Sequence, residues 1–455
     1  MATAASNPSR SEVPALGPER PVIWPRRYRQ RLKNGLEVVL VEVKTIPKFT
    51  AELYFRRGNA AADLPGLAEM TATVARTGTS RRTSRQVEES LRRWGADLST
   101  GAGADTSAIG FGGLSEFSKP IMELAAEIAR EAAFPADQFE RERRQKKEEL
   151  RIDRATPGFL AGERIRKVLF GAHPYANYAP SDAQVEAYTL EALVAFYRAN
   201  YRPSGALLLA VGDFDAEKML AEIESVFGDW TGAPREVAQP AAPPPARGRQ
   251  VHLVHVPGAV QSEILIGNMA ITRLHPDWLR LALANNIFGG AFNSRLVMNI
   301  REQKGYTYSP HSGVNALRQY GFFTVNAAVR NDVVAATLAE TFYELDRMRA
   351  LPVSDAELAD ALQYITGVFS LGLGTQGGIA GQLSVVLLNG LPEDYLETYR
   401  ERVRALTAAD VLEAARKYFD SAHAQIVIAG DRTVIGEQAA LFGDVDTYDP
   451  QGNRI

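Results

Sequence analysis

The sequence GLAEMTATVARTGT, from Gly66 to Thr79, predicts a helix with two different faces. Leu67, Met70 and Val74 follow at i, i+3 and i+7, the spacing of an apolar face packed on a core. Another face carries three residues: Glu69, Ala72 and Thr73. Flanking residues suggest the ends of this helix: Asp63 as N-cap, Pro65 in the first turn and Gly78 as the closing glycine.

This helix lies in the first of two similar halves. Three pairs of matching positions are separated by 217, 216 and 218 residues: Pro135 and Pro352, Leu190 and Leu406, and Gly212 and Gly430. Such nearly equal separations favour a duplicated domain. In each half, strand-like runs alternate with longer helical patterns, and several strand runs follow directly on one another. We therefore expect α+β domains with helices on one face of a mostly antiparallel or mixed sheet.

Composition shifts suggest the domain boundaries. Residues 1–24 are rich in Pro, Ser and Ala and predict a flexible N-terminal arm. The segment EVAQPAAPPPARGRQ, residues 236–250, predicts an extended linker. The predicted domains are then residues 25–235 and 251–455.

Bulk composition excludes several classes of function. Hydrophobic content of 45% with 23% charged residues is typical of a soluble globular protein, and the net charge of −3 argues against nucleic acid or anionic membrane as the main partner. The absence of cysteine excludes disulfides and thiolate metal sites. We see no signal peptide and no run of about 20 apolar residues, so we expect a soluble protein, cytoplasmic by default and periplasmic if a leader was trimmed.

The frame Gly-Leu-Ala, nine further residues and Gly-Thr resembles the active helix of the insulinase/pitrilysin family of inverted-motif zinc peptidases, which includes the mitochondrial processing peptidase. In active members that helix carries His-x-x-Glu-His, in which two imidazoles bind zinc and the glutamate activates water. The resemblance places Glu69, Ala72 and Thr73 at those three positions. A carboxylate thus replaces the first ligand, a methyl group replaces the base, and a hydroxyl replaces the second ligand.

The family's third ligand lies on a downstream helix that FERERRQKKEEL, residues 139–150, matches. The resemblance places the ligand position at Glu149 and a helper glutamate at Glu142. Two carboxylates and a threonine are a poor zinc site, so we expect no metal in this chain. Alternatively, both glutamates are simply solvated or ion-paired on a strongly charged helix. Six scattered histidines suggest no other metal site: His173, His252, His255, His275, His311 and His423.

The second half retains a different part of the resemblance, in IREQKGYTYS, residues 300–309. In the family an Arg and a Tyr seven residues apart reach the substrate at the opposing zinc helix, and Arg301 and Tyr308 match that pair. A guanidinium and a phenol can both stabilise a developing oxyanion. In the alternative interpretation, Arg301 makes a structural ion pair and Tyr308 begins a strand as a half-buried aromatic.

LSTGAGADTSAIGF, residues 98–111, corresponds to the strand that pairs with extended peptide in active relatives. Its small residues suit the approach of a peptide backbone, and they suit equally a bulge or a flexible edge.

The resemblance implies two homologous α/β-roll domains of the LuxS/mitochondrial processing peptidase-like metallohydrolase fold, related by a pseudo-twofold axis around a peptide chamber. It suggests the non-metal subunit of a heterodimeric zinc peptidase, whose homologous partner carries His-x-x-Glu-His and the zinc, and whose substrate is a peptide or unfolded protein. A second hypothesis is an inactive homodimeric scaffold or peptide-binding module. A third is an active enzyme with an unusual glutamate-based metal site.

Overall fold

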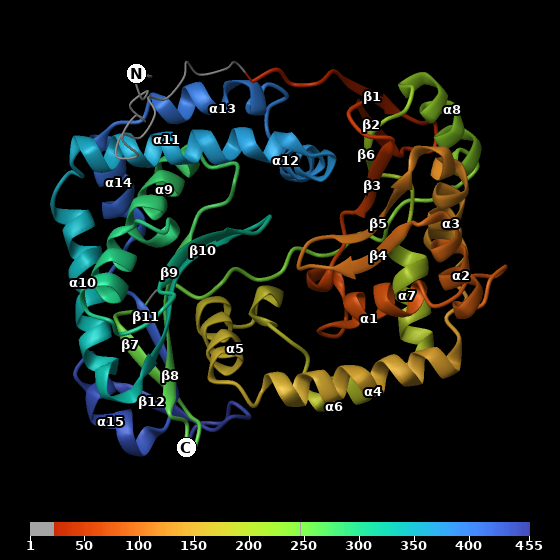
Figure 1. Cartoon of the computed structure of the whole chain (residues 1–455). Helices are drawn as coiled ribbons and strands as arrows, with labels where there is room; N and C mark the ends of the chain where they lie inside the picture. The colour runs from red at the N-terminus through yellow and green to blue at the C-terminus, as the bar shows by residue number, and fades with distance from the viewer. Residues whose placement is uncertain (1–21, 246) are drawn as a thin grey trace, which may run out of the picture.

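The computed structural model describes residues 22–245 and 247–455, which form two six-stranded mixed sheets (Figure 1). The first sheet has the order β1-β2-β6-β3-β5-β4. Its strands are β1 (Arg27–Arg31), β2 (Glu37–Glu42), β3 (Lys48–Phe55), β4 (Asp97–Ala102), β5 (Ser107–Leu114) and β6 (Leu207–Gly212). The second sheet has the order β12-β7-β11-β8-β10-β9. Its strands are β7 (Gln250–His255), β8 (Gln261–Ala270), β9 (His311–Ala316), β10 (Gly321–Arg330), β11 (Gln425–Gly430) and β12 (Val445–Tyr448).

Five strands of each sheet repeat one pattern. β2 and β6 are parallel, as are β7 and β11, and the remaining three pairings in each pattern are antiparallel. The sixth strands differ, because β1 is antiparallel to β2 whereas β12 is parallel to β7. The sheets therefore carry the same five-stranded topology, with a different strand added at one edge of each.

The repeat is also visible in the caps of two helices. Thr189 caps α7 (Leu190–Asn200) and Thr407 caps α14 (Ala408–Tyr418), each with its side-chain oxygen accepting from a backbone N–H. These threonines are 218 residues apart, as are Gly212 and Gly430. The cap threonines thus give a closer correspondence than the leucine pair used in the sequence comparison.

One face of each sheet packs on helices of its own half. The helices on the first sheet include α1 (Leu67–Ala75), α3 (Ser118–Glu131), α7 and α8 (Ala216–Phe227). Those on the second include α9 (Trp278–Asn285), α10 (Val334–Ala350), α14 and α15 (Arg432–Ala440). This is the arrangement that the strand and helix patterns predict.

The other face of each sheet packs on a helix from the opposite half, which the sequence did not predict. α5 (Pro157–Phe170) precedes the linker but packs on β8 and β11, and α12 (Gln376–Asn389) follows it but packs on β3 and β6 (Figure 1). The expectation of helices on one face only was therefore wrong. Both faces of these sheets carry apolar side chains, and the apolar faces of α5 and α12 bury the second face.

The remaining elements connect these layers. The longer helices are α2 (Ser84–Trp94), α4 (Ala136–Asp153), α11 (Asp355–Leu371) and α13 (Tyr395–Arg404), with a short α6 (Asp182–Glu186). Two π-helical segments also occur, η4 (Asn286–Gly290) and η5 (Val297–Gln303). Short 3-10 turns lie at η1 (Asn59–Ala61), η2 (Ser115–Phe117), η3 (Pro174–Ala176), η6 (Asn331–Val333) and η7 (Gly372–Gly374).

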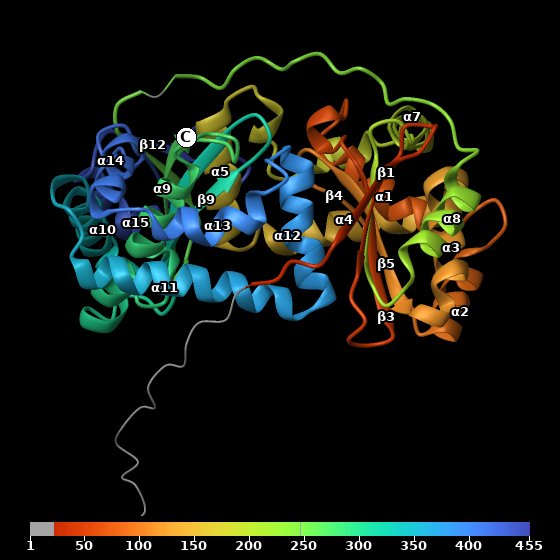
Figure 2. The ribbon, with the colours of Figure 1, turned by 90° about the horizontal axis from the view of Figure 1, so that it is seen from above.

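Of the two segments predicted to be irregular, the structure describes most of the linker and little of the N-terminal arm. Residues 231–245 form neither helix nor strand, and in the view of Figure 2 they follow the upper edge of the picture from one half to the other. The predicted arm lies mostly outside the described residues, but Trp24 packs its ring 5.9 Å from that of Phe369. Among the described residues, no single helix has the length and hydropathy of a membrane span; only α11–η7 and α12 taken together do, and they bend by 118°.

Candidate functional site

Helix α1 begins at Leu67, and the predicted Asp63 cap was wrong. The N-cap is Gly66, whose φ of 77° lies in the left-handed region and which makes no side-chain cap. The hydroxyl of Tyr188 donates to the carbonyl of Pro65 and holds this turn, while Asp63 pairs with Arg235 on the surface. The helix also ends earlier than predicted, because Arg76 is its C-cap rather than Gly78.

The predicted core face of α1 is confirmed, since Leu67, Met70 and Val74 are buried. On the face with the vestigial motif, Ala72 is fully buried and presents only its methyl group. Thr73 directs its hydroxyl back to the carbonyl of Glu69 at 3.0 Å, a hydrogen bond within the helix.

The Glu69 carboxylate is bound by an ammonium group. Lys146 Nζ, from α4, lies 3.0 Å from Glu69 Oε1. The lysine is one helical turn before Glu149, the position that the resemblance aligned with the third zinc ligand. A side-chain cation therefore neutralises the carboxylate at the first ligand position.

The two glutamates of α4 do not join Glu69. Glu149 is exposed and accepts from Gln145 at 3.0 Å, and Glu142 pairs with its neighbour Arg141 at 2.7 Å. These contacts match the interpretation of α4 as a charged, solvated helix. Within residues 22–245 and 247–455, no three His, Asp or Glu side chains converge as a metal-binding group.

Arg301 and Tyr308, in contrast, are brought into direct contact. The guanidinium carbon of Arg301 lies 4.4 Å from the ring centroid of Tyr308 and 4.7 Å from that of Phe292. Both rings are largely exposed, at 79% for Tyr308 and 71% for Phe292, whereas the Arg301 side chain is only 22% exposed. Two surface aromatic rings thus hold one guanidinium group. We call these three residues the arginine stack.

The arginine stack leaves most guanidinium donors available. Arg301 Nε lies 3.2 Å from the carboxylate of Glu302, which is 46% exposed. Arginine presents five N–H donors, and stacking on ring faces leaves those at its edge free. Tyr308 lies in the loop before β9, so the alternative of a half-buried aromatic beginning a strand was wrong. The stack can donate to a carbonyl or carboxylate beside an apolar surface.

The small-residue stretch forms a hairpin whose outer strand, β4, is an edge of the first sheet. β4 pairs with β5 in unbroken register from Asp97↔Gly112 to Ala102↔Ser107, so no bulge occurs there. Glu52, Gly110 and Ser99 lie side by side on three adjacent strands and share one face. Burial raises the pKa of Glu52 on this face. The geometry is that of an open edge strand.

Two residues of these sites escaped the sequence analysis. Phe292 follows a Gly-Gly pair in a loop, and only the fold brings it to Arg301, nine residues away. Lys146 carried a signal, since a residue one turn from Glu149 on the same helix faces the same neighbour. Arg301 and Glu69 lie in different halves, and no hydrogen bond or ion pair links them within the described residues.

Known proteins support one family assignment. Residues 187–365, which include Arg301 and Tyr308, match the family described as peptidase M16 inactive domain. The structure of a peptidase M16 inactive domain from Pseudomonas fluorescens superposes with a TM-score of 0.83 at 26% identity, covering 89% of this chain and 98% of that one. The chain thus resembles the peptidase M16 family, in sequence over residues 187–365 and in fold over most of its length. The resemblance to the insulinase type and the two-domain α+β fold are thereby confirmed.

Two M16 relatives are named as uncharacterized zinc proteases. One, from Streptomyces coelicolor, is 26% identical over 59% of this chain and 60% of its own length. The other, from Rickettsia bellii, is 22% identical over 88% of this chain and 96% of its own length. The chain is therefore similar to proteins named as zinc proteases, and the assignment of Glu69, Ala72 and Thr73 to the zinc-motif positions remains a prediction from the sequence.

Proposed function

We propose that this chain is the non-metal-binding subunit of a heterodimeric zinc metallopeptidase. Its homologous partner carries His-x-x-Glu-His and supplies the zinc and the general base. This chain completes the peptide chamber and presents Arg301 and Tyr308 to the substrate. The substrate class is a peptide or an unfolded protein.

The arginine stack is the observation that carries this proposal. A guanidinium held between two exposed rings has lost side-chain freedom before any substrate binds, so less entropy is lost when it grips a carbonyl. Exposed Phe292 and Tyr308 rings are also unfavourable in water, which supports a role for this surface in contact with another molecule.

The altered motif supports assigning zinc binding and water activation to the partner chain. Lys146 neutralises Glu69, and the position of the catalytic base is the buried methyl group of Ala72. A methyl group cannot accept a proton, so the activation of water falls to another chain. The edge strand β4 offers unpaired backbone groups to which an extended peptide can add.

The test is to assay peptide cleavage and zinc content for the purified chain, for the M16 chain with His-x-x-Glu-His encoded nearest to it, and for their mixture. We expect the chain alone to be inactive and free of zinc, and the mixture to cleave. A mixture that stays inactive while the partner retains its zinc would overturn the proposal. Cleavage by this chain alone would also contradict it.

Arg301→Ala and Tyr308→Phe separate this function from that of a homodimeric scaffold. In a two-chain peptidase both variants slow cleavage while the complex still forms, as size-exclusion chromatography would show. In a scaffold neither substitution changes assembly, and there is no cleavage to slow.

A further inference from the structure

Two hairpins carry the open edges of the two sheets. Their outer strands are β4 in the first sheet and β9 in the second. Residues 103–106 join β4 to β5, and residues 317–320 join β9 to β10. β4 is the strand to which an extended peptide can add, and β9 begins three residues after Tyr308 of the arginine stack. The placement of β4 relative to the stack therefore depends on how these two hairpins are connected.

The turn of the first hairpin is hydrogen-bonded to the turn of the second. Asp105 Oδ1 accepts from the hydroxyl of Tyr175, and Asp105 Oδ2 accepts from the backbone N–H of Arg318 at 3.0 Å. The Tyr175 hydroxyl accepts in turn from the backbone N–H of Gln319 at 3.3 Å. One carboxylate and one hydroxyl thus connect the first turn to two successive amides of the second. We call these four residues the hairpin lock.

Tyr175 is anchored on the second sheet, although it precedes the linker. It lies in η3, directly after α5, and is only 2% exposed. Its ring lies 5.7 Å from that of Phe170, which lies 5.6 Å from the ring of Phe322 in β10. Burial and the hydrogen bond to Asp105 raise the pKa of Tyr175, so the hydroxyl keeps its proton and donates it to the carboxylate.

The first turn is also fixed within its own half. The backbone N–H groups of Asn59 and Ala60 donate to the carbonyls of Gly103 and Ala104, both at 2.9 Å. Asn59 Oδ1 accepts from the backbone N–H of Glu69 in α1 at 3.3 Å. The hairpin lock therefore joins a turn that is held near α1 to a turn that is held on the second sheet.

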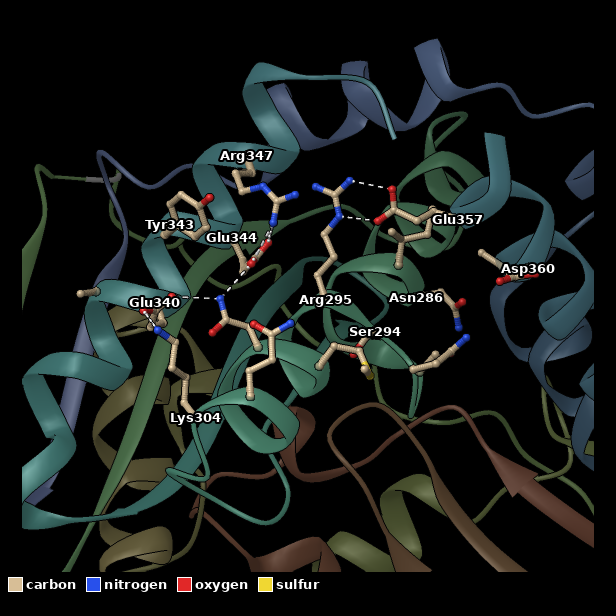
Figure 3. A pocket seen from close by; sticks show the side chains of 18 residues that line it. Asn286, Ser294, Arg295, Lys304, Glu340, Tyr343, Glu344, Arg347, Glu357 and Asp360 are labelled. Carbon is tan, nitrogen blue, oxygen red and sulfur yellow. Dashed lines mark hydrogen bonds and ion pairs between the residues drawn. The ribbon is translucent and has the colours of Figure 1, made fainter. Parts of the chain in front are cut away.

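The arginine stack has a fixed base in the second half (Figure 3). Arg295, two residues before η5, pairs with Glu357 of α11 at 2.7 Å, and Lys304, directly after η5, pairs with Glu340 of α10 at 3.0 Å. These ion pairs line a pocket of about 790 Å³ between η4, η5, α10 and α11. Because both ends of η5 are anchored, Arg301 has a defined position relative to the second sheet.

We propose that Asp105 and Tyr175 are positioning residues for the peptidase reaction. The hairpin lock holds β4 at a fixed place relative to the arginine stack, so that a peptide paired with β4 presents a carbonyl to Arg301. β9 is the spacer between them, since its six residues separate the locked turn from the stack by about 20 Å at 3.4 Å per residue. The inference rests on the proposed function, in which β4 and the stack contact one peptide.

The first test measures kcat and KM of the two-chain mixture with a peptide of ten residues. Tyr175→Phe removes only the hydroxyl, and Asp105→Ala removes both acceptors. Each should raise KM about five- to tenfold with kcat almost unchanged, because a mobile β4 must be ordered again when the peptide binds. A purely structural role would instead lower the folded fraction, and so the apparent kcat, at unchanged KM.

Two further variants sharpen this test. Tyr320→Phe is the matched control, because its ring lies 5.3 Å from that of His173 in the same aromatic cluster and its hydroxyl makes no hydrogen bond within the described residues. It should leave KM unchanged. The double variant Asp105→Ala/Tyr175→Phe should raise KM no more than the stronger single variant, since the two residues act as one unit.

The second test uses this chain alone. The chain has no cysteine, so Ser99→Cys on β4 and Ser309→Cys beside the stack, both at exposed positions, can carry a pair of spin labels. Double electron–electron resonance should give a narrow distribution of distances between the labels. Tyr175→Phe and Asp105→Ala should broaden that distribution, and Tyr320→Phe should not.

The outcomes separate this inference from the proposed function. An unchanged label distance distribution in both lock variants would overturn the inference, as would an unchanged KM in a mixture that cleaves. A wild-type mixture that does not cleave would refute the proposed function, while the label distances would still decide whether the lock holds the hairpins together. Circular dichroism checks that each variant is folded.

Discussion

Lys146 Nζ lies 3.0 Å from Glu69 Oε1 and joins α4 to α1. Glu69 is the residue that the sequence resemblance assigns to the first zinc-ligand position, and a side-chain ammonium group neutralises its carboxylate. The pair is partly solvated, with 22% of the Lys146 side chain and 44% of the Glu69 side chain exposed. Its contribution to stability is therefore small.

Replacing Lys146 should cost little stability and should not create a zinc site. Lys146→Met is expected to lower the free energy of unfolding by less than about 1 kcal/mol, as for other solvated ion pairs. Urea unfolding measures this, with Arg85→Met, which removes an exposed pair with Glu89, as control. Stoichiometric zinc in the dialysed Lys146→Met protein would contradict the view that these ligand positions are unsuited to the metal.

Substitutions in the arginine stack should lower the kcat/KM of cleavage by the two-chain complex by different amounts. Arg301→Ala is expected to lower kcat/KM about 100-fold, because it removes a donor to a developing oxyanion. Phe292→Leu keeps the guanidinium but loses one ring face worth about 0.5–1 kcal/mol, so a decrease of a few-fold is expected. Tyr364→Phe, at another exposed aromatic, controls for surface changes. Equal activity of all three variants would rule out a role for the stack.

Helix α12, which belongs to the second half but packs on β3 and β6, should stabilise the first sheet. Leu383 is 1% exposed and packs with Val39 and Leu209 of the first sheet. Leu383→Ala is expected to cost about 2–5 kcal/mol. Hydrogen exchange of the β6 amides should accelerate in this variant.

The matched control is Leu338→Ala, which removes an equally buried side chain from the core of the second half. It should accelerate exchange in the second sheet more than in β6. If Leu383→Ala left β6 unchanged, the packing of α12 on the first sheet would contribute little to its stability.

The turn before α1 should not tolerate a side chain at Gly66. A Cβ there would lie 2.5 Å from Tyr188 Oη, and the φ of 77° is strained for any L-residue. Gly66→Ala should therefore lower stability by more than about 1 kcal/mol. Gly101→Ala, in β4 with open space around its Cβ, should be nearly neutral. Thermal unfolding of the two variants checks this, and equal Tm values would contradict it.

The contribution of Glu52 to the free energy of unfolding should fall as the pH rises. Burial raises its pKa in the folded chain above the usual 4.5, so the folded state binds its proton more tightly than the unfolded state. The stabilisation from this proton is complete below about pH 4.5 and is lost as the pH rises through the folded pKa. Glu52→Gln should thus be more stable than the wild type at neutral pH, with a smaller difference near pH 4.

The measurement is urea unfolding of both proteins across that range. Glu123→Gln, at an exposed position on α3, should change stability equally at each pH and serves as control. A Glu52→Gln variant that is less stable at neutral pH would show that the carboxylate has a favourable partner in the folded chain.

Local patterns in the sequence predicted much of the fold. The spacing of Leu67, Met70 and Val74 identified the buried face of α1, and the matching separations of the proline pair and the glycine pair identified the duplication. These signals are reliable because each pattern arises from residues within a single helix or strand. The Asp63 cap failed because the hydroxyl of Tyr188, over 120 residues away, holds the turn at Pro65 and lets the helix begin after Gly66.

For the candidate sites too, some features could be predicted from the sequence and others required the tertiary structure. The sequence by itself determined the Gly-Leu-Ala and Gly-Thr frame of α1, the residues Glu69, Ala72 and Thr73 within it, and the spacing of Arg301 and Tyr308. Only the tertiary structure decided that Lys146 neutralises Glu69, that Phe292 completes the arginine stack, and that α5 and α12 are exchanged between the halves. Most of these contacts join residues far apart in the chain, and the free energy of all of them depends on packing and desolvation that no local pattern encodes.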